Sequence, residues 1–173
     1  MKKECKICLN AMVGNEERVI LRMLESSYKY IDYWVIQCNG SDKTKSIIEK
    51  FYKKKKIPGF TYEHEWDYPG VNRDHTLQTA LKSDHGCDWI LRMDADEQLE
   101  VDDDFDWTPL NEKSVQSFNM TAMGAGSIYF RTWLWNAGIP WKFEHDRRHE
   151  CIYIDGIGDN FERVQLPKGF RHI

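Results

Sequence analysis

The sequence predicts an α/β fold with a mainly parallel central sheet flanked by helices and a small antiparallel annex. Apolar runs alternate with amphipathic segments three times within residues 1–97, and the later residues read mostly as strands. Alternation of this kind favours a parallel sheet with right-handed crossovers. The ligand crevice of such a sheet lies beyond the carboxyl ends of its strands.

Each element is predicted from local pattern. Apolar or alternating runs predict strands at 5–12, 33–38, 60–64 and 87–93. Periodic apolar positions between them predict helices at 16–24, 47–56 and 72–83. Beyond them we expect an acidic linker at 97–106, strands at 115–120 and 127–135, and a polar aromatic segment up to residue 151.

Length and composition predict one globular domain. The chain has 173 residues, of which 41% are hydrophobic and 30% charged, and a chain of this size can bury a real core. We expect residues 1–173 to form a single domain with two halves, at 1–97 and 98–173.

Charge and cysteine content restrict the partners and the compartment. The net charge of −4 gives no overall attraction for nucleic acid or an anionic membrane. No apolar run is long enough for a transmembrane segment, and the five scattered cysteines with no secretory signal favour a cytoplasmic location. The pair Cys5 and Cys8 reads as part of a strand rather than as a zinc or redox motif, because the two side chains would face opposite ways.

An acidic motif, Asp94-Ala95-Asp96-Glu97, follows the apolar strand expected at 87–93. Residues two apart point the same way on an extended backbone, so Asp94 and Asp96 would face the sheet edge together. Hard oxygen ligands suit Mg²⁺ or Mn²⁺, which complete their shells with water and substrate phosphate oxygens. The alternative is a solvated acidic loop, and the position after a buried strand favours the metal site.

Several segments together resemble the family 2 glycosyltransferases, which have the Rossmann-like GT-A fold. The similar segments are the opening strand and turn at 7–17, the exit of the second strand at 38–44, the helix start Asn72-Arg73, the acidic motif at 94–97, and a closing segment from Trp141 to Glu150. The resemblance spans residues 6 to about 152. Its motifs are specific together, although each is weak alone.

The resemblance implies a transfer of sugar from a nucleotide-diphosphate sugar to a glycan or protein-linked hydroxyl acceptor, with Mn²⁺ or Mg²⁺ as cofactor. It makes residues 1–97 the donor half and residues 98–173 the acceptor-side half. Because the chain ends soon after the closing segment, we expect the acceptor side to be small, supplied by a partner, or truncated. The residues implied at the donor are Asn10, Ala11, Asn15, Cys38, Asn39, Arg73 and Asp94, with Asp94, Asp96 and His149 as metal ligands. Cys38 stands where the family usually presents an acid that binds the base, and the turn there is one residue short. Uridine is the favoured base.

The roles of three residue types stay open. Arg73 either lies beside the diphosphate or is a surface arginine of the helix. His149 is a metal ligand or, like Glu150, orients or deprotonates the acceptor hydroxyl; otherwise both lie on a solvated strand. Trp133, Trp135 and Trp141 either face a sugar ring or belong to the core.

Two other functions remain as alternatives. A sugar-phosphate nucleotidyltransferase would use a similar sheet and metal, but the acidic turn at 13–17 disfavours it, because such enzymes need a basic, glycine-rich first loop. A non-catalytic module that binds nucleotide sugars or glycans would keep the donor fold without a catalytic base. The sequence does not specify an oligomeric state.

Overall fold

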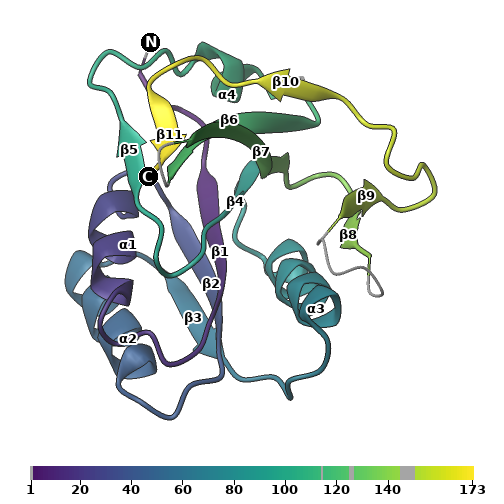
Figure 1. Ribbon diagram of the computed structural model, residues 1–173. Helices are drawn as coiled ribbons and strands as arrows, with labels where there is room; N and C mark the ends of the chain where they lie inside the picture. The colour runs from purple at the N-terminus through teal and green to yellow at the C-terminus, as the bar shows by residue number, and fades with distance from the viewer. Residues whose placement is uncertain (1, 114, 125–126, 145–150) are drawn as a thin grey trace.

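Four parallel strands form the first half of the central sheet. The computed structural model describes residues 2–113, 115–124, 127–144 and 151–173. The strands are β1 (Ile7–Val13), β2 (Tyr33–Cys38), β3 (Gly59–Tyr62) and β4 (Trp89–Arg92), and they lie in the order β3-β2-β1-β4. All three neighbouring pairs are parallel, so the predicted parallel sheet is confirmed (Figure 1).

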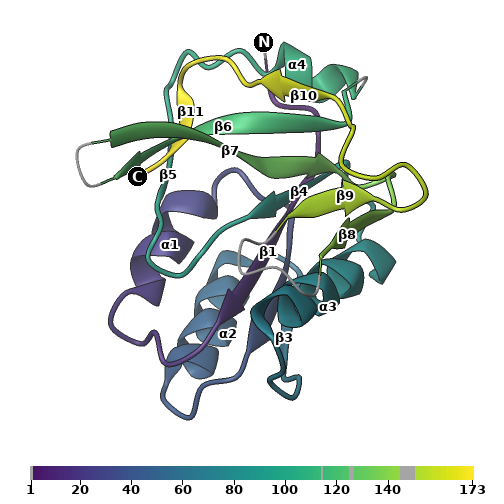
Figure 2. The same ribbon diagram turned by 45° about the vertical axis from the view of Figure 1, so that its right-hand side comes forward.

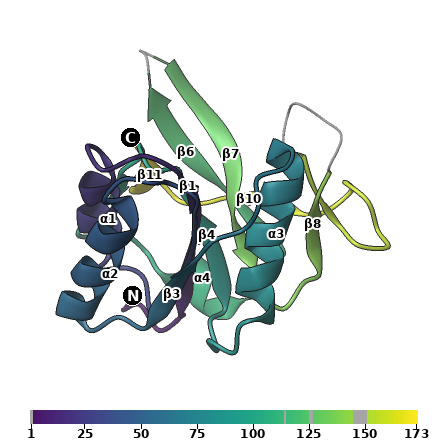
Figure 3. The same cartoon turned by 90° about the horizontal axis from the view of Figure 1, so that it is seen from below.

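Helices cover both faces of this parallel half. α1 (Ile20–Ser27) and α2 (Thr44–Lys55) lie on one face and α3 (Pro69–Lys82) on the other (Figure 3). α1 begins later than expected, because the backbone N–H groups of Glu16 and Glu17 bond to Thr44 and Asp42 instead of entering a helix. α3 begins earlier, at Pro69, a residue that suits the first helical turn.

The second half of the chain continues the same sheet. β7 (Ser127–Asn136) pairs antiparallel with β4, β6 (Ser117–Gly124) pairs with β7, and β11 (Phe170–His172) then lies between β6 and β5 (Leu99–Val101). β10 (Arg163–Gln165) pairs with the other part of β6, beside the short helix α4 (Thr108–Glu112). The acidic segment at 97–106 is therefore not only a linker, since it holds β5.

A separate antiparallel pair completes the fold. β8 (Trp141–Phe143) and β9 (Ile152–Ile154) form a two-stranded sheet that packs beside α3 (Figure 2). The predicted α/β fold with a small antiparallel annex is thus confirmed. The expected strands at 115–120 and 127–135 belong, however, to the central sheet rather than to the annex.

Two apolar cores result from the alternation of side chains along the strands. In β1, Leu9 and Ala11 face the core under α1 and α2, whereas Cys8 faces the core under α3. Cys5 lies in the first core and Cys8 in the second, as expected for two residues of an extended segment. Within the described residues, no helix combines the length and apolar character needed to cross a membrane.

Candidate active site at the carboxyl edge of the sheet

An ion-pair cluster surrounds Asp94, just beyond the end of β4. Arg73, in the first turns of α3, places Nη2 2.6 Å from Asp94 Oδ1. Arg92, the last residue of β4, places Nη2 3.1 Å from Oδ2 and 3.3 Å from Oδ1. The side chain of Arg73 is 12% exposed, that of Arg92 is 9% exposed and that of Asp94 is 28% exposed. Both oxygens of Asp94 therefore accept from guanidinium groups.

The charge state of Asp94 follows from this surrounding. Burial by itself would raise the pKa of the carboxyl group. The positive charges of Arg92, Arg73 and Arg131 outweigh burial and hold the pKa of Asp94 below its ordinary value. Asp94 is therefore a carboxylate at neutral pH, and it pairs with two largely buried guanidinium groups.

Glu97 closes the acidic turn. Its Oε2 accepts a hydrogen bond from the backbone N–H of Asp94 at 2.8 Å and lies 3.2 Å from Nδ1 of His172. His172 is 2% exposed and its ring lies 4.3 Å from that of Trp133. The other ring nitrogen, Nε2, is buried and has no hydrogen-bond partner among the described residues. Sequence reasoning missed His172, because only the pairing of β11 with β5 brings it here.

The acidic turn offers a restricted set of metal ligands. Asp96 is exposed at the turn, whereas Asp94 is engaged with arginines. In the part of the chain that the structure describes, no three His, Cys, Asp or Glu side chains are gathered into a metal cage. The exposed carboxylate of Asp96 fits a divalent cation that takes most of its ligands from water and a bound phosphate.

Hydrogen bonds join the turns after β1 and β2 at the same carboxyl edge of the sheet. Asn15 Oδ1 accepts from the backbone N–H groups of Ser41 at 2.9 Å and Asp42 at 3.2 Å. A Cβ atom on Gly40 would lie 2.4 Å from the carbonyl oxygen of Gly14, so only glycine permits this approach. The predicted donor residue Asn15 therefore has a structural task that the sequence did not reveal.

Two adjoining cavities open at the carboxyl ends of β1, β2 and β3. One, of about 390 Å³, is lined by residues 12–14 together with Asn39 and Trp66. The other, of about 310 Å³, is lined by Asn39 and residues 63–66. Asn39 and Trp66 border both cavities, and the Trp66 side chain is 56% exposed. Sequence reasoning included Asn39 but missed Trp66, although an aromatic residue shortly after an expected strand was a usable signal.

The segment after β3 is anchored at His64. Asn39 Oδ1 accepts from the backbone N–H of His64 at 3.3 Å, and Asn39 Nδ2 donates to the carbonyl of His64. The His64 ring stacks on that of His75 in α3, with centroids 3.5 Å apart and planes inclined by 6°. The cavity wall therefore has a fixed attachment to both β2 and α3.

Other predicted site residues lie inside the sheet. Asn10 is 4% exposed, and its Nδ2 donates to the backbone carbonyls of Val35 and Thr76. Ala11 and Cys38 are each 1% exposed, and burial raises the pKa of the Cys38 thiol. Contact of these three residues with a donor stays a prediction. His149 and Glu150 lie outside the described residues, so their roles also stay predictions.

The tryptophans of the second half belong to the core. Trp133, Trp135 and Trp141 are 3%, 1% and 0% exposed. Trp135 packs against Phe143, and Trp141 packs against Phe161. Of the two readings of these rings, core packing is the one that the structure supports.

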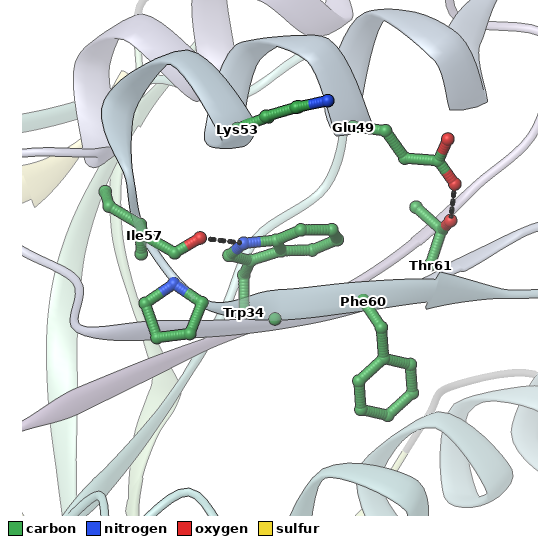
Figure 4. Close-up of a pocket in the computed structure, with 8 residues that line it drawn as sticks. Trp34, Glu49, Lys53, Ile57, Phe60 and Thr61 are labelled. Atoms are coloured by element: carbon green, nitrogen blue, oxygen red, sulfur yellow. Dashed lines mark hydrogen bonds between the residues drawn. The ribbon is translucent and has the colours of Figure 1, made fainter.

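A third cavity lies away from this site, between α2 and β3 (Figure 4). It is lined near the first residues of β2 and β3 by Trp34 and Gly59, whereas the candidate site is at the opposite, carboxyl ends. Trp34 Nε1 donates to the carbonyl of Ile57 at 3.0 Å, and Thr61 Oγ1 donates to Glu49 at 2.5 Å. The first contact joins β2 to the segment after α2, and the second joins α2 to the edge strand β3. Neither contact involves the acidic turn.

Solved structures with a similar fold support the architecture. The chain resembles the mannosyltransferase PcManGT from Pyrobaculum calidifontis, solved in complex with GDP-Man and Mn²⁺, with a TM-score of 0.58 and 16% identity over 94% of this chain. It also resembles TarS from S. aureus, with a TM-score of 0.54 and 19% identity over 70% of this chain. The chain covers 55% of the former protein and 22% of the latter.

At these identities the likeness shows the fold alone. The chain has the Rossmann-like GT-A fold that the sequence predicted. Neither a protein-family model nor a curated protein sequence matches it.

Proposed function

We propose that the protein is a metal-dependent glycosyltransferase that moves a sugar from a nucleotide-diphosphate sugar to a glycan or other hydroxyl acceptor. One observation carries the proposal. The acidic turn with its arginine cluster lies at the same edge of the sheet as the two cavities bordered by Asn39 and Trp66. A nucleoside diphosphate needs both, a cavity for its base and cationic groups for its phosphates.

The chain's own residues divide the work at the donor. Arg73, held by Asp94, offers a planar guanidinium that matches phosphate oxygens in a fork. Asp96 is the accessible carboxylate for Mn²⁺ or Mg²⁺, with His172 and His149 as candidate further ligands. When bound, the cation supplies Lewis-acid stabilisation of the charge that develops on the departing diphosphate. The complex of PcManGT with GDP-Man and Mn²⁺ supports this cofactor.

The proposed acceptor-binding groups lie in the closing segment, Trp141 to Glu150. We propose His149 and Glu150 as the groups that orient or deprotonate the acceptor hydroxyl. In the sequence, β8 precedes the closing residues, and it packs beside α3, whose first turns carry Arg73. The backbone N–H of Phe143, at the end of β8, donates to Asp74 Oδ1 at 2.9 Å, and this contact next to Arg73 supports the proposal.

Release of nucleoside diphosphate tests the proposal. The protein is incubated with a panel of UDP-, GDP-, CDP- and ADP-sugars and Mn²⁺, and we expect release from one donor that stops when EDTA is added. Binding of a donor without release, with or without acceptors, would instead identify a nucleotide-sugar binding module. Formation of a nucleotide sugar from a sugar phosphate and a nucleoside triphosphate would identify a nucleotidyltransferase.

A further inference from the structure

We propose that the segment 63–66 reads the nucleobase of the donor, with Trp66 as the ring on which the base stacks and Glu65 as an acceptor for a ring N–H group. The site would then select uracil or guanine, which carry a ring N–H on their recognition edge, over cytosine or adenine. This inference rests on the proposed function and deepens it.

The position of Trp66 carries the first step. It borders both cavities at the carboxyl edge, one lined also by residues 12–14 at the end of β1 and one lined also by residues 63–65 after β3. Trp66 is 56% exposed, whereas every other tryptophan of the chain is at most 9% exposed. A large ring left uncovered at a cavity offers an apolar face for a base, and stacking on aromatic rings is a recurrent way of binding bases.

The second argument comes from the carboxylates that line the smaller cavity. Glu63 and Glu65 both line the cavity of about 310 Å³. Glu63 lies 2.8 Å from the ammonium group of Lys45, so its charge is compensated, and the carboxylate of Glu65 is exposed beside Trp66. An ionised carboxylate only accepts hydrogen bonds. It favours the N3–H of uracil or the N1–H of guanine, and it repels the lone pair that cytosine and adenine present at the corresponding ring nitrogen.

The third argument is that the segment 63–66 is held in place by its contacts at His64. Two hydrogen bonds with Asn39 hold the backbone of His64, and the stacked ring of His75 holds its side chain. The segment is therefore fastened to β2 and α3 before any ligand arrives. A surface held in place in this way loses less entropy on binding.

Calorimetric titration with UDP and GDP in the presence of Mn²⁺ tests the stacking role. For whichever of UDP and GDP binds more tightly, we expect Trp66→Ala to lower the affinity by about 5- to 100-fold, the usual range for losing one stacked base. Trp66→Phe should restore most of that affinity. Tyr68→Ala is the matched control, because Tyr68 is a similarly exposed ring, 42% exposed, that lines neither cavity. Binding of inorganic pyrophosphate with Mn²⁺, which lacks a base, should not change in Trp66→Ala.

Fluorescence gives a second measurement on the unaltered protein. Because Trp66 is the only strongly exposed tryptophan, acrylamide quenching reports mainly on its ring. We expect bound nucleoside diphosphate to reduce that quenching and pyrophosphate to leave it unchanged. Equal quenching with and without bound nucleotide would overturn the stacking role.

Base selection tests the role of Glu65. We expect UDP or GDP to bind at least about tenfold more tightly than CDP and ADP. Glu65→Gln should reduce that ratio of affinities. Asp67→Asn, at another exposed carboxylate of the same segment, is the control and should leave the ratio unchanged. Tighter binding of CDP or ADP overturns the base selection. Full affinity in Trp66→Ala overturns this inference alone, whereas a wild-type protein that binds no nucleoside diphosphate overturns the proposed function as well.

Discussion

Arg73 and Asp94 join the start of α3 to the end of β4, with Nη2 of the arginine 2.6 Å from Oδ1 of the aspartate. Asp94 lies two residues before Asp96, and Arg92, the last residue of β4, also pairs with it. The two aspartates of the acidic motif therefore differ in role. Asp94 holds guanidinium groups in place, whereas Asp96 remains accessible.

The first prediction concerns folding stability. Asp94→Ala leaves the guanidinium groups of Arg73 and Arg92 partly buried without their shared counter-charge, and we expect a loss of roughly 2 kcal/mol in the free energy of unfolding. Asp96→Ala removes an exposed carboxylate and should change that free energy little. Urea denaturation of both variants measures the difference. Equal stability of the two would show that Asp94 does not hold the cluster.

The second prediction concerns metal-supported binding. Asp96→Ala should abolish the part of UDP or GDP affinity that depends on Mn²⁺, because it removes the accessible carboxylate of the turn. In the wild-type protein, thermal shift should be larger with nucleotide and Mn²⁺ together than with nucleotide and EDTA. Calorimetric titration of the variant with and without Mn²⁺ gives the decisive comparison. Unaltered Mn²⁺-dependent affinity in Asp96→Ala would contradict the metal assignment.

The third prediction concerns turnover. His149→Ala should lower transfer or donor hydrolysis by about 100-fold or more, with a smaller effect on nucleotide binding, as for the loss of an acid-base or metal-orienting group. Glu150→Gln is the paired variant, and a larger loss there would assign the base to Glu150. Initial rates at saturating donor measure both. Full turnover in both variants would exclude the closing segment from catalysis.

The fourth prediction concerns pH. Burial, followed by the charge of His64, lowers the pKa of His75 below its ordinary value, with Lys82 adding to the shift and Asp74 opposing it. The folded protein therefore binds fewer protons than the unfolded chain. The contribution of neutral His75 to the free energy of unfolding is present above the unfolded pKa of about 6.5. It is lost as the pH falls through the lower pKa of the folded state. We expect the melting temperature to fall between about pH 7.5 and 5.5.

The variant His75→Phe separates this stack from other histidines. It keeps a flat ring over His64 but cannot be protonated, so it should reduce the acid loss of melting temperature. Part of the fall in melting temperature at acid pH should remain, since burial also lowers the pKa of His85. An unchanged pH profile in the variant would exclude the stack as a cause.

The fifth prediction concerns the fastened turns. Gly40→Ala would bring a Cβ atom to 2.4 Å from the carbonyl oxygen of Gly14, and we expect it to cost about 1–3 kcal/mol of folding free energy. Gly14→Ala is the matched control, because a Cβ there meets nothing within 4 Å. Thermal unfolding of both measures the contrast. Similar stability of the two would mean that the turns can move apart.

The sequence by itself determined the parallel half of the fold and the place of the site. Strand 33–38 was predicted to the residue, because a buried parallel strand is a nearly continuous apolar run bounded by turns, here interrupted only by Gln37. The acidic motif was placed at the sheet edge for the same reason, since a strand's end fixes where the following side chains emerge. These features depend on neighbours in the chain.

Only the tertiary structure decided which residues meet at that edge. β5, β10 and β11 have three residues each, too few for a local pattern, and they are strands because other strands supply their hydrogen bonds. The pairing of β11 with β5 places His172 against Glu97, 75 residues earlier in the chain. Likewise the ion pair of Arg73 with Asp94 depends on the packing of α3 against β1 and β2, which brings its first turns to the end of β4, and no local pattern encodes that packing.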